Sequence, residues 1–405
     1  MGSPAPCIWS DRGQTCRGSV TDSVQYWRTS GLETLRDWPT QSNVDGSMDS
    51  ASKENLELEQ IEHLEDVRED WTRLAEAAGH PFASWDWNAA WWGRFGLGKR
   101  LYSFVCRDRT GDAVAILPLY IAGNRPLRVA RFLGYADLHS PVCASADRAL
   151  AARAMREVMG RSGGCPVVVA ERLPSAQGWG ELLGGRLLAR QQNPVLRLGG
   201  MSWEDFLASK SANFRGQVRR KERRLIEEQG LTFRLADQAS RLTEDLDALF
   251  RLHALRWGDK STGCFEGDQG EFQRDFAVAA LQRGWLRLWF AEIAGEQVAA
   301  WYGWRFAGAE WYFQAGRDTR WDHYSLGFVM LAHTVREACR DGVSDYHFLA
   351  GPDAYKWRFA QEDPGAESRL LSSGPIAGIA SLAVEVANSL PASARQRVLR
   401  ISSPT

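Results

Sequence analysis

Two stretches of this chain, far apart in the sequence, predict the same β-hairpin. Residues 101–121 read as two apolar strands around a turn at Gly111, and residues 286–306 read as two apolar strands around a turn at Gly295. Aligning the two glycines also aligns Val114 with Val298 and Ala115 with Ala299. Such matched hairpins suggest an internal duplication of one α/β module, although any two hairpins share a turn glycine and apolar strands.

Helix and strand patterns surround both hairpins. Around the first hairpin, periodicity predicts helices at residues 56–78, 85–95, 146–159 and 177–183 and strands at residues 167–172 and 194–198. Around the second, it predicts a helix opened by Ser202, helices at residues 214–229, 242–257, 271–283 and 326–339, and strands at residues 310–315 and 343–349. Helices that alternate with antiparallel hairpins indicate an α+β (mixed α/β) fold rather than a doubly wound parallel sheet.

The chain divides into four predicted segments. Residues 1–55 carry little periodicity, so we expect a disordered or mis-annotated N-terminal extension with the true start at Met48; the alternative is a real, partly helical arm. The first module is expected at residues 56–199 and the second, with the donor site, at residues 200–375. Residues 376–405 look like an amphipathic helical tail, which could pack on the core, pair subunits or touch a membrane surface.

Composition excludes several classes of function. The 405 residues carry 49 Lys+Arg against 50 Asp+Glu, a net charge of -1, so no global positive field favours nucleic acid or an anionic membrane. No apolar stretch is long enough to span a bilayer, and residues 1–20 lack the apolar core of a secretory signal. The 7 cysteines are scattered without a C-x-x-C pair, which argues against a disulfide framework or a zinc site and favours the cytoplasm.

A phosphate site is predicted after the strand at residues 310–315. That strand leads to a helix whose N-terminus lies at residues 324–327, and a helix N-terminus offers unpaired N–H groups and partial positive charge. Gly327 permits close backbone approach, and Arg317 and Arg320 would strengthen the binding of a pyrophosphate. Neither a G-x-G-x-x-G nor a Walker A sequence occurs in the chain. The alternative is an ordinary core helix capped by a serine.

Two further pairs of residues are candidates for chemistry. His253 and Arg256 lie three residues apart on one helix face beside aromatic surface, although a lone helical histidine is more often a packed residue than a catalyst. Asp345 and His347 alternate on a strand and share one face, which could point into a cleft or be a partly polar strand face.

A strongly basic helix is expected at residues 214–229. Its cations are Arg215, Arg219, Arg220, Lys221, Arg223 and Arg224. They predict either a solvated face offset by nearby glutamates or an anion-binding wall for a phosphorylated donor or carrier. Nucleic acid is an alternative ligand for this patch alone.

Several segments together resemble a known family. They are residues 82–92 (FASWDWNAAWW), 117–120 (LPLY), 132–134 (FLG) with Asp137, the basic helix, 252–257 (LHALRW), 321–327 (WDHYSLG) and 351–356 (GPDAYK). In this order they resemble the CelD-like (cellulose-biosynthesis-protein-like) branch of the GNAT N-acetyltransferases. That branch is similar to the Fem-type peptidyl transferases, which add amino acids to peptidoglycan precursors. The resemblance covers residues 71–359.

The resemblance implies a tandem pair of GNAT-like acyl-CoA N-acyltransferase modules. It implies direct transfer of an acyl group, most simply acetyl from acetyl-CoA, to an amine of a small-molecule or envelope/polysaccharide-related acceptor, without a metal. The implied donor-binding residues are Gln314, Arg317, Arg320, Ser325, Gly327 and Phe328. The implied candidates for catalysis are Asp318, His347, Tyr355 and Lys356, with Glu310 and Tyr324 as further acid or base candidates. The implied acceptor-binding residues are Asp137, Arg224, His253, Arg256 and Trp257.

The chain also departs from the usual GNAT pattern. The Q/R-x-x-G-x-G/A signature is absent, and only Gly327 is a partial counterpart. Fem-type enzymes use aminoacyl-tRNA, and residues 355–359 (YKWRF) resemble their aromatic-lysine motif. The resemblance therefore leaves two alternatives open, a transferase that uses charged tRNA and a non-catalytic GNAT-like binding module. It does not indicate an oligomeric state.

Overall fold

The computed structural model describes the central part of the chain. The described residues are 56–122, 129–161, 165, 167–258, 263–351 and 353–372. The predicted N-terminal extension with Met48 and the predicted tail at residues 376–405 lie outside them.

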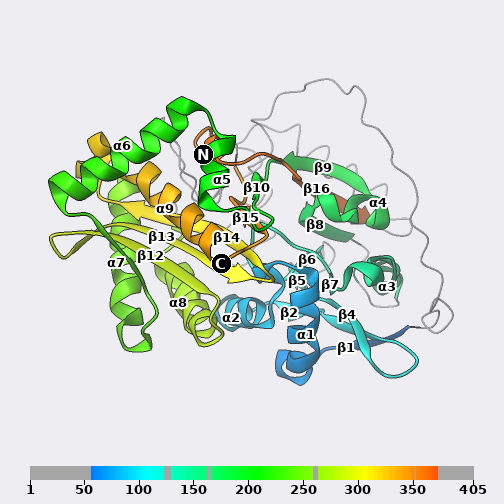
Figure 1. Ribbon diagram of the computed structural model, residues 1–405. Coiled ribbons are helices and arrows are strands. Elements are labelled where there is room, and N and C mark those ends of the chain that lie inside the picture. Colours follow the sequence, from blue (N-terminus) through cyan, green and yellow to red (C-terminus); the bar gives the residue numbers. More distant parts are fainter. Residues whose placement is uncertain are drawn as a thin grey trace, which may run out of the picture.

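Two of the three sheets are built mainly from the N-terminal half (Figure 1). The smaller has the order β1-β3-β4-β7, with β1 (Glu57–Gln60), β3 (Phe104–Arg107), β4 (Ala113–Leu117) and β7 (Val142–Cys143). The larger has the order β2-β5-β6-β8-β16-β9, with β2 (Arg100–Leu101), β5 (Leu119–Ala122), β6 (Val129–Phe132), β8 (Val167–Pro174), β16 (Ala366–Ser372) and β9 (Arg186–Gln191). The helices of this half are α1 (Arg68–Ala78), α2 (Trp85–Phe95), α3 (Arg148–Gly160) and α4 (Trp179–Leu183).

The third sheet carries the second half of the fold. Its order is β10-β15-β14-β13-β12-β11, with β10 (Val195–Arg197), β15 (Asp345–His347), β14 (Ala309–Arg317), β13 (Glu296–Phe306), β12 (Leu286–Ile293) and β11 (Thr232–Leu235). The helices α7 (Leu242–Trp257) and α8 (Gly267–Gln282) pack on one face. The helices α5 (Trp203–Ser209), α6 (Ala212–Gln229) and α9 (Leu326–Arg340) pack on the other.

Both halves follow one order of elements. Each begins with a strand and two helices (β1, α1, α2 and β11, α7, α8) and continues with antiparallel strands, a helix and a strand. In both halves the strand after that helix pairs in parallel, β8 with β6 and β15 with β14. The expected α+β fold with two GNAT-like modules is confirmed, because helices and mostly antiparallel strands recur in the same order.

The two modules exchange one strand each. The strand expected to complete the first module, at residues 194–198, instead forms β10 and pairs antiparallel with β15 of the third sheet. In return, β16 belongs by sequence to the expected second module but lies between β8 and β9. The expectation was wrong because an isolated apolar run does not specify which sheet edge completes its hydrogen bonds.

The first hairpin is split between two sheets. The expected strand at residues 113–121 breaks at Pro118 into β4 and β5, which belong to different sheets. Proline has no N–H to donate to a strand ladder, and its carbonyl instead accepts from Leu133 N–H at 2.7 Å. The second hairpin forms as expected, with β12 antiparallel to β13.

The predicted helix at residues 56–78 is helical only in its second part. Its beginning is the edge strand β1, which pairs with β3, and α1 starts at Arg68. The charged pattern of this segment fits a helix face as well as an edge strand, and only the distant partner strand decides between them. The helix ends at Gly79 as predicted, with φ +82°.

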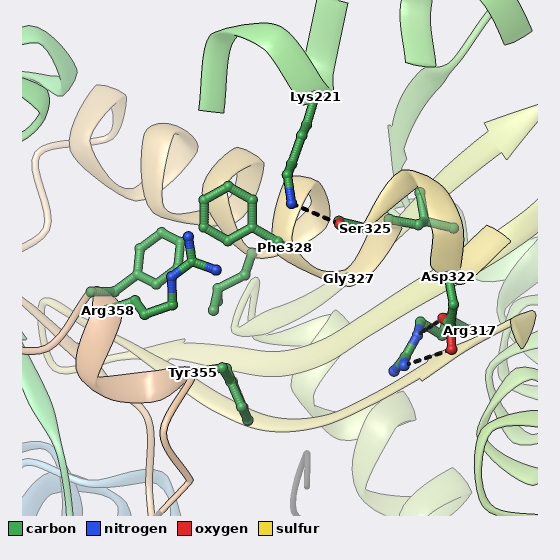
Figure 2. A pocket seen from close by; sticks show the side chains of 11 residues that line it. Lys221, Arg317, Asp322, Ser325, Gly327, Phe328, Tyr355 and Arg358 are labelled. Carbon is green, nitrogen blue, oxygen red and sulfur yellow. Dashed lines mark hydrogen bonds and ion pairs between the residues drawn. The ribbon is translucent and has the colours of Figure 1, made fainter. Parts of the chain in front are cut away.

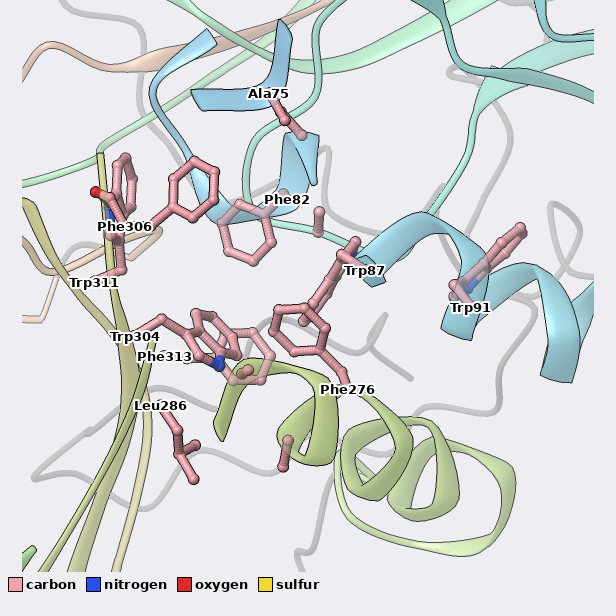
Figure 3. Close-up of a cluster of buried hydrophobic side chains, with 14 of the residues drawn as sticks. Ala75, Phe82, Trp87, Trp91, Phe276, Leu286, Trp304, Phe306, Trp311 and Phe313 are labelled. Carbon is pink, nitrogen blue, oxygen red and sulfur yellow. Dashed lines mark hydrogen bonds between the residues drawn. The ribbon is translucent and has the colours of Figure 1, made fainter. Parts of the chain in front are cut away.

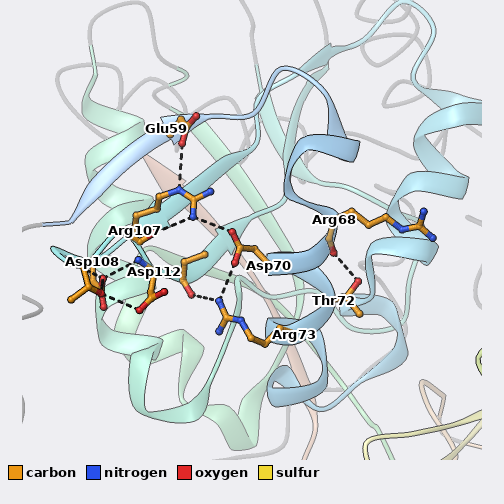
Figure 4. A network of polar contacts seen from close by, with 11 residues as sticks. Glu59, Arg68, Asp70, Thr72, Arg73, Arg107, Asp108 and Asp112 are labelled. Carbon is orange, nitrogen blue, oxygen red and sulfur yellow. Dashed lines mark hydrogen bonds and ion pairs between the residues drawn. The ribbon is translucent and has the colours of Figure 1, made fainter.

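A network of charged side chains holds the first strand and helix together (Figure 4). Arg107 on β3 donates to Asp70 on α1 at 3.0 Å and to Glu59 on β1 at 3.5 Å. Arg73 donates to the same Asp70 at 3.1 Å and to the carbonyl of Ala113 at 2.8 Å. These pairs are partly exposed, so they fix the position of α1 more than they stabilise the fold.

An aromatic core joins the two modules (Figure 3). Trp87 of α2 is fully buried, and its ring lies 4.7 Å from Phe272 and 4.8 Å from Phe276 of α8. It also meets Trp304 of β13 at 5.4 Å and Phe82 at 5.0 Å, all edge to face. Because one ring is shared between α2, α8 and the third sheet, the modules form one continuous core.

Candidate functional site

The site begins where β14 leads into α9. After β14, the 3-10 turn Thr319–Tyr324 brings the chain to Ser325, which precedes α9. Ser325 has a left-handed backbone (φ +59°), and its side chain makes no capping bond to α9. Its Oγ instead accepts from Lys221 Nζ of α6 at 2.7 Å. The serine-capped core helix considered above is therefore not what forms, and the N-terminus of α9 faces a pocket.

The pocket at this helix end has a volume of about 280 Å³ (Figure 2). Its lining residues are Lys221, Arg317, Asp322, Ser325, Leu326, Gly327, Phe328, Leu331, Tyr355, Arg358 and Phe359. Three of them are cations from three separate elements, and one is a carboxylate. The pocket therefore combines an excess of positive charge with the positive end of a helix dipole, an arrangement that favours an anion.

The cations are held at the pocket by specific contacts. Burial, with Arg358 and Arg220 nearby, lowers the pKa of Lys221. The Arg358 guanidinium lies 4.1 Å from the ring centroid of Phe328 and donates to Gln217 of α6 at 2.9 Å. Arg317 donates to the carboxylate of Asp322 at 2.5 and 3.2 Å. Lys221, Arg317 and Arg358 are therefore each fixed at the pocket by at least one such contact.

The expected donor residues fall into two groups. Arg317, Ser325, Gly327 and Phe328 all line the pocket. Arg320 does not: its side chain is 76% exposed and pairs with Asp318 at 2.6 Å, outside the lining. Gln314 lies on the other face of β14, which carries α7. Lys221 and Arg358 were not assigned this role from the sequence, although the basic helix and the YKWRF segment that contain them had been singled out.

The central strand β14 is irregular beside the pocket. Opposite β13, Tyr302 aligns with Gln314 and Gly303 with Tyr312, so Phe313 is an extra residue in a β-bulge. A Cβ on Gly303 would lie 2.0 Å from the carbonyl oxygen of Trp311, so only glycine allows this approach. With β15, β14 pairs only at residues 309–311. The remaining residues of β14, 312–317, therefore have no parallel pairing with β15. Tyr312 at the start of this part lies near Tyr355.

The end of α7 packs directly on β14. A Cβ on Gly316 would lie 2.3 Å from the backbone nitrogen of His253, so the helix and strand backbones touch there. This contact brings three predicted acceptor residues of α7, His253, Arg256 and Trp257, to the same strand as Gln314. Arg256 lies near Arg317, Tyr312 and Tyr355, and burial together with Arg317 lowers its pKa.

The predicted acid and base residues differ in their surroundings. Arg320 hydrogen-bonds Asp318 and lowers the pKa of that carboxyl, which makes it a poor proton acceptor. His347 stacks on Trp311 with ring centroids 3.8 Å apart, and burial lowers its pKa to about 4.

Tyr355 lines the pocket, and burial raises its pKa, so its hydroxyl stays protonated. Burial raises the pKa of Glu310 to about 7, but its carboxylate is paired with Arg305 at 2.9 Å.

Lys356 and Asp137 lie in the interior between the modules. Lys356 Nζ donates to the carbonyls of Leu349 and Ala350 at 3.3 and 2.6 Å, and burial lowers its pKa. It lies 3.5 Å from the carboxylate of Asp353. Lys356 therefore holds the loop after β15 in place. Asp137 lies near it and 3.7 Å from Arg172.

Two further predicted residues, Arg224 of α6 and Tyr324, contact each other. Arg224 donates to Glu228 at 3.0 Å and lies over the ring of Tyr324 at 4.5 Å. Neither Arg224 nor Tyr324 is among the pocket's lining residues.

Comparison with known proteins supports the fold of the second module. Residues 212–357 match the family model described as Acetyltransferase (GNAT) domain. The chain is similar to the crystal structure of FemX, with 11% identity over 78% of this chain and 97% of that chain and a TM-score of 0.52. It is also similar to the C-terminal domain of a proposed lysylphosphatidylglycerol synthetase from Agrobacterium fabrum, with 12% identity over 80% of this chain and 97% of that chain and a TM-score of 0.50. No curated protein matches the sequence.

These similarities identify a GNAT-type fold in a two-module arrangement. At such low identities the structural likenesses concern the fold alone. In the described part of the chain, no helix has the length and apolar character to cross a membrane. The same residues contain no group of three or more His, Cys, Asp or Glu side chains placed to hold a metal ion.

Proposed function

We propose that this protein is an N-acyltransferase that moves an acyl group from acyl-CoA to an amine of a small-molecule or envelope/polysaccharide-related acceptor. The observation that carries the proposal is the pocket at the start of α9, where Lys221 and Arg358 add charge to a helix N-terminus. A pyrophosphate is the ligand such a site suits, because N–H groups and cations converge on it. We also propose that the protein belongs to the CelD-like branch, that it acts in the cytoplasm, and that its two modules lie at residues 56–199 and 200–375.

The proposed reaction is a direct acyl transfer. The acceptor's neutral amine attacks the thioester carbonyl carbon, a C–N bond forms, and the C–S bond breaks. A backbone N–H of β14 near the bulge at Phe313 would polarise the carbonyl oxygen. Tyr355, which stays protonated, lines the pocket and would give its proton to the leaving thiolate. The amine loses its extra proton to a base or to water, which completes the amide.

An aminoacyl-tRNA donor is the second candidate, and the position of α6 favours it. Lys221 reaches the pocket from α6, and the exposed cations Arg219, Arg220 and Arg223 continue along the same helix. Such a row of cations suits a phosphate backbone that extends beyond the pocket. A third candidate, a non-catalytic binding module, is favoured by the missing glycine signature.

Isothermal titration of the full-length protein with acetyl-CoA, longer acyl-CoAs and charged tRNA tests these alternatives. We expect an acyl-CoA to bind and Lys221→Ala or Arg358→Ala to weaken binding about tenfold or more, since each removes a charged hydrogen bond. Arg224→Ala is the matched control, because Arg224 lies on the same helix but outside the pocket. Binding of charged tRNA without acyl-CoA would establish the second candidate. Failure of both donors to bind would leave the binding module.

A further inference from the structure

Four buried polar atoms of α7 and β14 lie without hydrogen-bond partners in the described part of the chain, on the side of β14 opposite the pocket. They are Nε2 of His253, Nε1 of Trp257 and both amide atoms of Gln314, and none has a hydrogen-bond partner among the described residues. His253 and Gln314 are each only 1% exposed. A buried polar group without a partner costs about 1–3 kcal/mol, so four of them in one place indicate a ligand that satisfies them. We call these three side chains the acceptor cluster.

The fold places the acceptor cluster on one side of β14. Tyr302 and Gln314 are aligned neighbours on β13 and β14, and the Tyr302 ring meets Phe265 at 6.1 Å. The same Phe265 ring lies 4.8 Å from His253. Trp257 follows one helical turn after His253, with ring centroids 6.2 Å apart. The cluster is therefore on the α7 side of β14, whereas the donor pocket is on the α9 side.

Positive charge adjoins the acceptor cluster. Arg256 lies between His253 and Trp257 on α7, with its guanidinium 5.4 Å from the ring centroid of Trp257. Burial, and then the nearby Arg317, lower the pKa of Arg256, while Tyr312, Asp322 and Tyr355 act in the opposite direction. A half-buried guanidinium of this kind is stabilised by a ligand that brings negative charge.

The donors and acceptors in the cluster define the ligand's chemistry. Trp257 Nε1–H and the Gln314 amide N–H can only donate, and Arg256 adds charged donors. Gln314 Oε1 can only accept, and the Nε2 of His253 accepts in one of its tautomers. A ligand that matches this set carries an anionic acceptor group and an N–H donor.

We propose that the acceptor substrate is an amine that also carries a carboxylate, as in an amino acid or an acidic amino sugar. Arg256 and Trp257 bind the carboxylate, and Gln314 Oε1 with His253 Nε2 receives the N–H groups of the amine. This inference rests on the proposed acyl transfer, because it assigns the second substrate of the same site.

The test follows the Trp257 indole resonance of full-length protein labelled with ¹⁵N at tryptophan. Trp257→Phe assigns the signal, and the probes are L-lysine, L-lysine methyl ester and cadaverine, titrated to the same final concentration. We expect a saturable shift with lysine and an affinity about tenfold weaker or worse for the two probes without a carboxylate. In Arg256→Met that preference disappears, while the other indole resonances report that the variant is folded.

Arg251→Met is the matched control. Arg251 lies on the same helix but is exposed and donates to the Gln297 carbonyl at 3.4 Å, so the preference for lysine should survive there. Equal responses to the three probes, no saturable response, or an unchanged preference in Arg256→Met would overturn the inference. A saturable shift with glucosamine but not with lysine would do so too and would indicate an amino sugar without a carboxylate.

A parallel titration with acyl-CoA separates this inference from the proposed function. If acyl-CoA binds but the lysine preference is absent, only the choice of acceptor is wrong. If acyl-CoA does not bind, the donor assignment fails whatever the lysine titration shows.

Discussion

Lys221 Nζ of α6 donates to Ser325 Oγ at 2.7 Å, at the residue that immediately precedes α9. Ser325 holds a left-handed backbone there, which a residue with a side chain rarely adopts. The serine hydroxyl therefore binds a cation of another helix instead of capping its own. This relationship keeps the first turn of α9 open toward the pocket and holds one of its cations in place.

Substitutions at Ser325 should separate backbone strain from binding. Ser325→Gly relieves the left-handed strain, so we expect an unchanged or higher melting temperature, with a gain of up to about 1 kcal/mol. Ser325→Ala keeps the strain and loses the hydroxyl, so it should melt lower than Ser325→Gly. Both variants release Lys221, and thermal unfolding with and without acyl-CoA measures the two effects. A lower melting temperature for Ser325→Gly than for Ser325→Ala would contradict this account.

Trp87 should be a major source of stability for both modules. Trp87→Ala removes a fully buried ring shared by α2, α8 and β13, and we expect a loss of about 3–5 kcal/mol in the free energy of unfolding. The control is Leu97→Ala, because Leu97 is 96% exposed and should cost little. Urea denaturation followed by tryptophan fluorescence and by circular dichroism measures the change. Separate transitions for the two modules in the wild type would show that their core is not shared.

Alanine substitutions at Gly316 of β14 and Gly216 of α6 should change stability in opposite directions. Gly316→Ala places a Cβ 2.3 Å from the backbone of His253, so α7 and β14 must move apart, and we expect lower stability and lost transfer activity. Gly216→Ala is the matched control in α6, where nothing lies within 4 Å of the new Cβ. Alanine is favoured over glycine inside a helix by about 1 kcal/mol, so Gly216→Ala should be slightly stabilising. Differential scanning calorimetry of both variants decides; a Gly316→Ala protein of unchanged stability would refute the close packing.

Buried histidines, among them His80 and His139, should make stability depend on pH. Burial lowers the pKa of His80 to about 3 and that of His139 to about 4, from 6.5. Below pH 6.5 the unfolded chain therefore binds protons that the folded protein does not, and stability falls as the pH drops toward 4. Each histidine should cost about 1.4 kcal/mol per pH unit in that range.

A variant isolates this effect from groups of opposite sign. Burial raises the pKa of Glu310 to about 7, so its contribution to stability falls as the pH rises from 4.5 to 7. This change is opposite in sign to that of the histidines and offsets part of the pH dependence that they cause. We therefore expect His80→Gln to reduce the pH dependence by about one proton relative to the wild type. Urea denaturation at a series of pH values measures it. An identical slope in both proteins would show that His80 titrates normally in the folded state.

Much of the helical content was predictable because local signals suffice for it. The helices that became α2, α6, α7 and α9 carry strong apolar periodicity and clear end signals, such as Gly230 in a left-handed conformation after α6. The apolar face of α6 was also expected, and Phe214, Val218 and Leu225 are buried as predicted. The matched hairpins pointed to two modules, which the order of elements confirms.

The site was predictable only in part. The turn after β14 and the start of α9 were located from Gly327 and the neighbouring arginines, because these features are consecutive in sequence. The basic helix that contains Lys221 was considered as an anion-binding wall, but its meeting with Arg358 at this pocket was not predicted, because the two residues are more than a hundred positions apart in the chain. Arg320 was included on adjacency alone, and it points to Asp318 instead.

The sequence by itself determined the local units: the helices with periodic apolar faces, the two hairpins with their glycine turns, and the helix N-terminus after β14. Only the tertiary structure decided that β10 and β16 change sheets, that residues 57–60 form a strand, and that the end of α7 at His253 packs against β14 at Gly316. The physical reason is that turns and helices are stabilised by contacts within a few residues, whereas strand pairing and polar satisfaction depend on partners that the chain brings together only when it folds.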